Sequence, residues 1–314
     1  MGQPDQLELF FSMVLALFWE AAPFLLLGSL VGALVEAWLS PEFLARRMPS
    51  GRWGQVGLGL GAGMVLPTCE CGVVPVVRRL LERGAPPSFS LTYMLAAPVI
   101  NPVVLVSTYV AFQGSWSMLL GRVVVVALSA AAVGLWWSRR PGRELLRPEA
   151  ALVIQPQDAI EPLAPGCTPG CGCGHDHGPA SRRPGRILVR TAEEFAHMSV
   201  YLLAGAVAAA LVKAFLPLEW LGAVQGNLLL SLAAMMGLAV LLSVCSEADA
   251  FVAASFLGFP LASQLAFIAL GPMVDLKLVA MWGGTFRRGV VPLLILAPTL
   301  LVAGLSLLWG WLCW

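Results

Sequence analysis

Long blocks of apolar residues, separated by short polar stretches, make up most of this sequence. A helix needs about 20 residues to cross the hydrocarbon core of a bilayer. Blocks long enough for this cover residues 10–39, 89–112, 118–137, 195–216, 261–282 and 290–312. A helix satisfies its own backbone hydrogen bonds within one lipid-exposed segment. The pattern therefore predicts an all-α integral membrane protein embedded in the lipid bilayer.

The composition agrees with this prediction. Of the 314 residues, 58% are hydrophobic and 12% are charged, whereas about a quarter of the residues in a soluble domain are charged. The formal net charge is +1. A chain with so little net charge shows no basic surface for nucleic acid, and we expect no nucleic-acid partner.

A polar segment divides the chain into three parts. Residues 138–193 are rich in proline, glycine and arginine and show little apolar periodicity, which is typical of a tether. This linker separates a first membrane unit, residues 1–137, from a second one, residues 194–314. We therefore expect two membrane-embedded units joined outside the bilayer.

The two membrane units resemble each other. Glycine, cysteine and proline positions recur in the same order in both units: Gly28 with Gly205, Cys69 with Cys245, Gly84 with Gly258, Pro86 with Pro260, and Pro98 with Pro272. Apolar segments match by chance at single positions, but a shared order of these residue types is harder to obtain by chance. The sequence therefore predicts an internal repeat.

The basic residues predict how the repeat is oriented, because cytoplasmic loops carry an excess of Lys and Arg. All arginine clusters lie on one side if residues 54–81 enter the membrane, break at residues 67–72 and return. These clusters are Arg46 and Arg47, Arg78 and Arg79, the linker arginines, and Arg287 and Arg288. Each unit then has three transmembrane helices plus one broken or re-entrant hairpin, and this odd count produces two inverted repeats, as in many transporters. Eight transmembrane helices are the alternative.

The break at residues 67–72 contains the first candidate transport site. Proline and glycine interrupt helices, and an interruption at membrane depth is tolerated where it is buried or lines a wet cavity. Cys69 and Cys71 bring soft sulfur ligands to this break, and Glu70 brings a carboxylate. The alternative is a kinked helix in which both cysteines pack as small apolar residues.

The matching region of the second unit adds acidic residues. Glu247 and Asp249 follow Cys245 inside a strongly apolar stretch. Carboxylates are costly in such surroundings and usually belong to ion or proton pathways. We therefore assign all three residues to the transport site. An acidic pair at the lipid–water boundary is the alternative.

A third group of candidates follows the paired prolines. Asn101 and Asp275 occupy equivalent positions in the two units. Lys277 is two residues from Asp275, so the two side chains share a helix face only if the helix unwinds there. We include all three in the transport site, with a kink stabilised by Asn or Asp as the alternative.

The linker carries a cluster of cysteine and histidine residues: Cys167, Cys171, Cys173, His175 and His177. Such a cluster can bind a soft or borderline metal, and we expect zinc, copper or trivalent arsenic there. The spacing is not that of a zinc finger, so the cluster would sense or deliver metal. An inert tether is the alternative. No other cofactor is required.

The first unit also resembles a known family. The run Cys-Glu-Cys-Gly-Val-Val-Pro-Val-Val-Arg-Arg at residues 69–79 and the run Pro-Val-Ile-Asn-Pro at residues 98–102 are similar to motifs of a bacterial family of predicted permeases. That family includes the trivalent organoarsenical efflux permeases, and the resemblance extends over both units. It implies a multi-pass protein of the bacterial inner membrane, and the arginine pattern places its linker in the cytosol. Family members usually have serine where this chain has Glu70, and the added acid favours a cation.

We interpret the chain as a secondary-active efflux permease for a thiophilic metalloid species, such as a trivalent organoarsenical, or for copper, zinc or another soft metal. The sequence has no Gly-Lys-Ser/Thr phosphate-binding loop, so proton antiport is the simplest energy source. We do not expect an enzyme: an intramembrane thiol enzyme is disfavoured by the single residue between the paired cysteines. A metal-sensing scaffold would not need paired broken helices. Homo-oligomerisation is left open.

Overall fold

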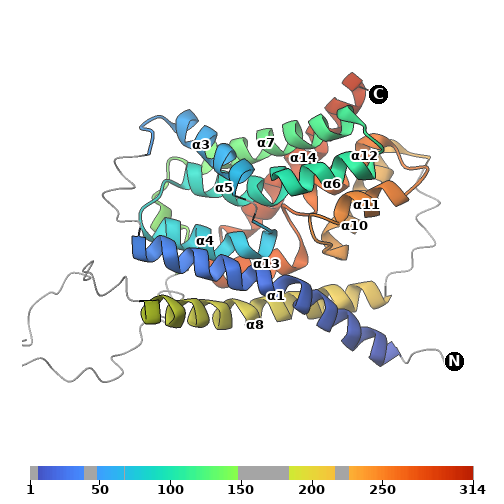
Figure 1. The fold of residues 1–314 in the computed structure, drawn as a ribbon. Coiled ribbons are helices and arrows are strands. Elements are labelled where there is room, and N and C mark those ends of the chain that lie inside the picture. Colours follow the sequence, from blue (N-terminus) through green and yellow to red (C-terminus); the bar gives the residue numbers. More distant parts are fainter. Residues whose placement is uncertain (1–5, 39–47, 67, 148–183, 216–225, 314) are drawn as a thin grey trace, which may run out of the picture.

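The computed structural model describes residues 6–38, 48–66, 68–147, 184–215 and 226–313. Regular structure in these ranges is helical, as the apolar pattern predicts (Figure 1). The first membrane unit contains α1 (Gln6–Trp38), α3 (Arg52–Val65), α4 (Glu70–Glu82), α5 (Pro87–Ile100), α6 (Pro102–Ala111) and α7 (Trp116–Trp137), followed by the short 3-10 helix η1 (Gly142–Glu144). The second contains α8 (Pro184–Phe215), α10 (Leu228–Leu242), α11 (Asp249–Ser255), α12 (Leu261–Leu270), α13 (Leu276–Thr285) and α14 (Val291–Cys313).

Five segments in the described ranges are long and apolar enough to cross a membrane. They are Phe10–Val35, Pro87–Ala111, Trp116–Trp137, Ile187–Leu211 and Val291–Cys313. These segments correspond to five of the six apolar blocks, so the expectation of a multi-pass membrane protein is confirmed. The sixth block, residues 261–282, is not one uninterrupted helix, because α12 ends at Leu270 and α13 begins only at Leu276.

Two of the helix interruptions follow from local chemistry. The backbone of Asn101 is extended, with φ −72° and ψ 155°, and separates α5 from α6. The following Pro102 disfavours helical geometry at the residue before it. Between α10 and α11, Ser243 adopts a left-handed conformation with φ 47°. The pattern of apolar residues continues through both breaks, so it does not reveal them.

Helices α4, α5 and α12 are almost entirely buried. Each residue of α5 is buried, as are residues 262–270 of α12. Helix α5 packs against α3, α4 and α7, while α12 packs against α10, α14 and α7. The two membrane units meet along the α1–α8 pair on one side and the α7–α14 pair on the other (Figure 1). The breaks in the interrupted helices lie between these two layers.

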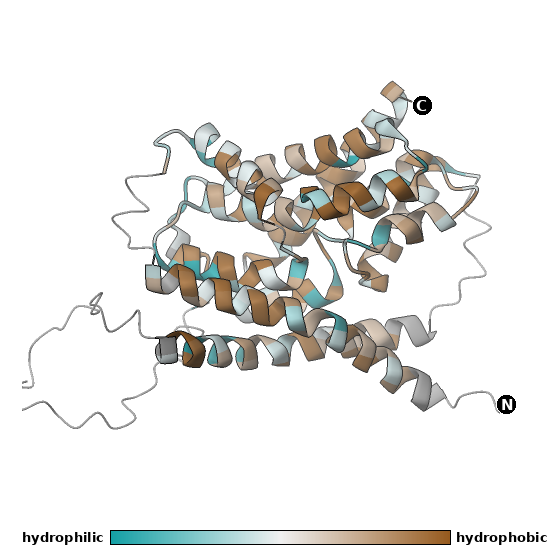
Figure 2. Cartoon of the chain, viewed as in Figure 1, coloured by the Kyte–Doolittle hydropathy of each residue, from teal (hydrophilic) through white to brown (hydrophobic). Residues whose placement is uncertain are grey.

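The outer helices expose apolar side chains. Trp19, Leu203 and Leu300 are exposed on α1, α8 and α14. Figure 2 shows hydrophobic residues along the length of these outer helices, and hydrophilic residues at the loops and at the central breaks. A soluble protein rarely exposes so continuous an apolar surface, whereas a lipid bilayer accommodates it. The polar residues that lie inside the molecule are therefore the ones that need a specific explanation.

Candidate functional site

The break between α3 and α4 places a carboxylate inside the molecule. Cys69 is the N-cap of α4, and its sulfur accepts a hydrogen bond from the backbone N–H of Gly72 at 3.4 Å. Glu70 and Cys71 are the first helical residues, and both are 1% exposed. The positive end of the helix dipole favours a negative charge at this position. The sequence therefore starts α4 with a buried acid between two thiols.

The break between α12 and α13 produces a second buried polar start. Asp275 is the N-cap of α13, and its Oδ1 accepts a hydrogen bond from the backbone N–H of Leu278 at 2.6 Å. The backbone of Asp275 is extended, with φ −136° and ψ 171°. Because the helix begins only after Asp275, Lys277 can turn back toward it. This is the unwound case that the sequence left open, and Lys277 Nζ lies 3.7 Å from Asp275 Oδ2.

The two helix starts meet through Lys277. Its Nζ also lies 3.5 Å from Glu70 Oε1, so one ammonium group is shared between carboxylates of the two membrane units. Glu70 and Asp275 are each 1% exposed and Lys277 is 0% exposed. Two carboxylates and one ammonium leave a formal charge of −1 in a buried position. We call Glu70, Asp275 and Lys277 the central charge cluster.

Cysteines from both units lie around this cluster. Cys69 and Cys71 flank Glu70 at the start of α4. Cys245 is in the break between α10 and α11, two residues after Ser243, whose Oγ contacts the start of α13. Cys69, Cys71 and Cys245 are free thiols. In the described part of the chain, no three His, Cys, Asp or Glu side chains are close enough to one another to hold a metal ion.

A hydrogen bond ties the α10–α11 break to the start of α13. Ser243 Oγ accepts from the backbone N–H of Leu276 at 3.3 Å. The left-handed backbone of Ser243 ends α10 and turns the chain toward Cys245. The three breaks at Cys69, Ser243 and Asp275 are thus physically adjacent, although sequence spacing alone gives no indication of this contact.

Asp249 lies in a different environment from the central charge cluster. Its two carboxylate oxygens accept hydrogen bonds from Arg122 Nη1 at 3.0 Å and Nη2 at 2.7 Å. Arg122 also donates to Thr108 Oγ1 at 2.7 Å, and the pair joins α7 of the first unit to α11 of the second. Glu247, by contrast, is exposed. Of the two predicted acids in this stretch, the structure places one in an ion pair and the other at the surface.

Asn101 is placed as a helix cap. Its Oδ1 accepts from the backbone N–H of Val104 at 3.0 Å, and its Nδ2 donates to the carbonyl of Ala97 at 3.1 Å. Both bonds are local to the α5–α6 break. Asn101 and Asp275 therefore cap equivalent helices, but only Asp275 also contacts a charged side chain.

Glycines in α1 and α8 allow both helices to approach these breaks. A Cβ atom on Gly28 would lie 2.5 Å from Gly72 Cα, next to the Cys69–Cys71 segment. A Cβ atom on Gly205 would lie 2.6 Å from Lys277 Cα. Real Cβ atoms do not approach backbone this closely, so each helix needs glycine at this position. The paired glycines that the sequence singled out both pack on the site.

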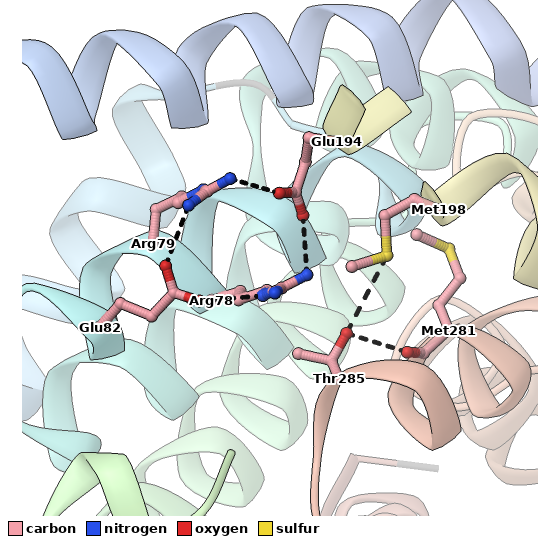
Figure 3. A network of polar contacts seen from close by, with 7 residues as sticks. All are labelled: Arg78, Arg79, Glu82, Glu194, Met198, Met281 and Thr285. Carbon is pink, nitrogen blue, oxygen red and sulfur yellow. Dashed lines mark hydrogen bonds and ion pairs between the residues drawn. The ribbon is translucent and has the colours of Figure 1, made fainter. Parts of the chain in front are cut away.

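A second buried ionic network connects α4 with α8 (Figure 3). Arg78 Nη1 and Arg79 Nη2 lie 3.3 and 2.6 Å from the two carboxylate oxygens of Glu194, which is 1% exposed. Both arginines also contact Glu82, at 3.0 and 3.1 Å. From the sequence, these arginines were interpreted only as charges that set the orientation, and Glu194 was missed. The available signal was an acid directly before the apolar block 195–216 and two adjacent arginines near the end of α4.

The predicted metal cluster of the linker, Cys167 to His177, lies outside the described residues.

Comparison with known proteins places the chain in one family. The family model described as "Predicted permease" matches residues 6–311. The UPF0718 protein YcgR of Bacillus subtilis (strain 168) is 36% identical over 302 residues, which is 95% of each chain. A protein of Streptococcus mutans serotype c named "Putative two-component membrane permease complex subunit" is 31% identical over 282 residues, covering 90% of this chain and 87% of that one.

A more distant relative is the UPF0718 protein YraQ of Escherichia coli (strain K12), which is 26% identical over 145 residues, 45% of this chain and 40% of that protein. No solved structure matches the chain. The match to the family model spans both membrane units, and the predicted resemblance to permeases is confirmed. The chain belongs to this family of predicted permeases.

Proposed function

We propose that this permease is a secondary-active exporter of a thiophilic metalloid species, such as a trivalent organoarsenical. The observation that carries the proposal is the position of Cys69, Cys71 and Cys245 around one buried charge cluster. Thiolate sulfur is the ligand that soft metals and metalloids prefer. Cysteines from both membrane units would bind the solute between the units, where a movement of one unit against the other would release it.

Helix lengths support the proposed architecture of two inverted repeats. Helices α3 and α4 have 14 and 13 residues, which at about 1.5 Å per residue gives roughly 20 Å each. The hydrocarbon core is roughly 30 Å thick, so neither helix spans it alone. Helix α10, with 15 residues, is similarly short. A broken hairpin in each unit, together with three crossings, fits these lengths better than eight full crossings.

The same architecture supports a location in the bacterial inner membrane with the linker in the cytosol. The linker cysteines and histidines would then bind zinc, copper or trivalent arsenic and pass it to, or sense it for, the membrane site. The name of the Streptococcus mutans relative describes one subunit of a two-component complex. We therefore include assembly with a partner subunit in the proposal, alongside a homo-oligomer.

Proton antiport is the energy source that we propose for export. Carboxylates buried within membrane segments commonly lie on proton pathways. Of the three candidate acids in the second unit, Asp275 is the best placed, since it belongs to the central charge cluster while Asp249 is held by Arg122 and Glu247 is exposed. In inside-out vesicles, export of the metalloid should acidify the exterior or discharge an imposed proton gradient. A proton gradient that does not change when substrate is added would argue against proton coupling.

Export of zinc, copper or another soft metal is the second candidate. Glu70 and Asp275 favour metal export, because a buried carboxylate pair does not stabilise a neutral organoarsenical. A metal cation would be bound by both carboxylate oxygens and thiolate sulfur. The two candidates use the same site and differ in the charge of the solute.

The test is the cellular content of each solute, measured by elemental mass spectrometry. Cells with and without the protein are loaded with trivalent methylarsenical, arsenite, copper or zinc. We expect lower content of one species in cells with the protein, and loss of this effect when Cys69, Cys71 and Cys245 are replaced by serine. Cys313→Ser is the matched control, because this thiol is exposed at the end of α14. Unchanged export in the triple variant would remove the three thiols from the mechanism.

A further inference from the structure

Three buried carboxylate oxygens of the central charge cluster have no hydrogen bond. Glu70 Oε1, Glu70 Oε2 and Asp275 Oδ2 are without a hydrogen-bond partner in the part of the chain that the structure describes. Glu70 and Asp275 are each 1% exposed. Buried polar atoms are nearly always hydrogen-bonded, and an unsatisfied charged group is especially costly. These oxygens therefore require an explanation beyond packing.

Among the described residues, the cation near these oxygens is Lys277, and it forms no close contact with them. Lys277 Nζ lies 3.5 Å from Glu70 Oε1 and 3.7 Å from Asp275 Oδ2. Charge-assisted hydrogen bonds between nitrogen and oxygen are about 2.7–2.9 Å long. The ammonium group is thus shared between two carboxylates without forming a close contact to either of them.

The Arg122–Asp249 pair shows what a tight buried ion pair looks like in the same molecule. Its two N···O distances are 3.0 and 2.7 Å, and one cation neutralises one anion. The Arg122–Asp249 pair is therefore electrically neutral, and its two charged groups are in close contact. The central charge cluster has one cation for two anions, with longer distances, and has the capacity to accept further positive charge.

We propose that Glu70 and Asp275 form a cation-exchange site in which the ammonium group of Lys277 is a tethered occupant that a transported divalent cation displaces. This inference rests on the second candidate function, export of a metal cation, and names the charge of the substrate at that site. A divalent cation between Glu70 and Asp275 leaves no net charge once Lys277 has moved away. Cys69 and Cys71, on either side of Glu70 in the chain, add sulfur ligands when their thiols release their protons to water. Such a ligand set suits a borderline cation such as Zn²⁺ that accepts both sulfur and oxygen.

The backbone around Lys277 indicates that its side chain alone moves. Helix α8 packs directly on Lys277, since a Cβ atom on Gly205 would lie 2.6 Å from Lys277 Cα. Asp275 is likewise fixed as the N-cap of α13. In the occupied state, rotation of the lysine side chain would let the two carboxylates close on the cation. Among the described residues no metal-ligand set of three is assembled, so the proposed site requires this rearrangement before it binds a cation.

The experiment measures Zn²⁺ binding to the purified full-length protein by equilibrium dialysis with elemental mass spectrometry. The linker would bind Zn²⁺ as well, so the background variant carries serine or alanine at Cys167, Cys171, Cys173, His175 and His177. Mg²⁺ and neutral trivalent methylarsenical are the comparison solutes. Each variant is first checked for a single folded species by size-exclusion chromatography.

Competition by a tethered cation makes an unusual prediction. Lys277→Met should bind Zn²⁺ at least tenfold more tightly than the background protein, because the internal competitor is gone. Glu70→Gln should bind it at least tenfold more weakly, because one of the two carboxylates is lost. Glu144→Gln, which changes an exposed carboxylate of η1, is the matched control and should bind Zn²⁺ like the background protein.

Lys277→Arg keeps the proposal testable if Lys277→Met does not fold. The planar guanidinium can contact two carboxylates at once and stays charged, so we expect Zn²⁺ affinity to fall at least threefold. Unchanged or weaker Zn²⁺ binding by folded Lys277→Met would overturn the proposal, as would unchanged or tighter binding by Lys277→Arg.

Failure of this site and failure of the proposed function give different results. If cells export a thiophilic solute but the variants do not change Zn²⁺ affinity as predicted, the permease function is supported and the exchange site is refuted. Zn²⁺ exchange at Glu70 and Asp275 without export of any solute supports the site and removes the export function.

Discussion

Asp249→Asn should destabilise the protein strongly, because it removes the counter-charge of a fully buried arginine. Arg122 is 0% exposed, and its two terminal nitrogens lie 3.0 and 2.7 Å from the Asp249 oxygens. Its other acceptors, Thr108 Oγ1 at 2.7 Å and the Ser246 carbonyl at 3.5 Å, are neutral and cannot replace that charge. Breaking a buried ion pair by removing one partner costs about 3–5 kcal/mol.

The assay is thermal unfolding in detergent, followed by the loss of the monodisperse peak in size-exclusion chromatography. An unfolding entropy of about 2.1 cal/mol/K per residue gives about 0.66 kcal/mol/K for 314 residues. A loss of about 3–5 kcal/mol should therefore lower Tm by roughly 5–8 °C. Glu247→Gln is the matched control, since it neutralises an exposed acid two residues away. Surface substitutions usually change stability by less than about 0.5 kcal/mol.

A double-mutant cycle separates the ion pair from general damage to α11. Arg122→Leu and Asp249→Leu should each destabilise, while the double variant should be more stable than either single variant, because no buried charge is left unpaired. If Asp249→Asn melts at the same temperature as Glu247→Gln, the reasoning is refuted. Additive effects in the cycle would contradict direct coupling between the two side chains.

Three further substitutions test other contacts. Gly205→Ala, which would place a methyl group 2.6 Å from an α13 backbone atom, should lower Tm and reduce the transport rate at least several-fold. A Cβ atom at Gly283 meets open space, so Gly283→Ala should change neither. Equal behaviour of the two variants would contradict the packing argument. Glu194→Gln removes the buried partner of two arginines and should cost about 3–5 kcal/mol in thermal unfolding, whereas Glu144→Gln, at an exposed acid, should change little. Similar melting of the two variants would argue against the network in Figure 3. Asn101→Ala deletes a helix cap and should cost about 1 kcal/mol in the same assay, with transport retained; complete loss of transport at normal stability would instead give Asn101 a direct role at the site.

The apolar pattern was sufficient to predict the class of fold and most of the membrane segments. Apolar blocks of bilayer length have one physical solution in lipid, so five of the six blocks match spans of the structure. The exact positions of the helix breaks were harder to predict from the sequence. Asn101–Pro102 carries a local signal in the proline, while the left-handed turn at Ser243 has no sequence signal that the apolar pattern reveals.

The contacts within the site could not be derived from sequence, because they join residues far apart in the chain. Their spacing suggested that Asp275 and Lys277 would point apart unless the helix unwound. The extended backbone at Asp275 shows that the helix begins only after this residue, so the two side chains can approach each other. The contact between Glu70 and Lys277 depends on how two membrane units pack. Arg122 is another example, since its partner Asp249 is in the other unit.

Uptake into inside-out membrane vesicles tests the central claim, that thiols and charges of both units form one transport site. Vesicles containing the protein are given trivalent methylarsenical and Zn²⁺ separately, and the accumulated element is measured by mass spectrometry. The account predicts energy-dependent uptake of one of the two solutes, loss of that uptake in the Cys69/Cys71/Cys245→Ser variant, and normal uptake in Cys313→Ser. Uptake that survives in the triple variant, or absence of uptake of both solutes in vesicles with folded protein, would contradict it.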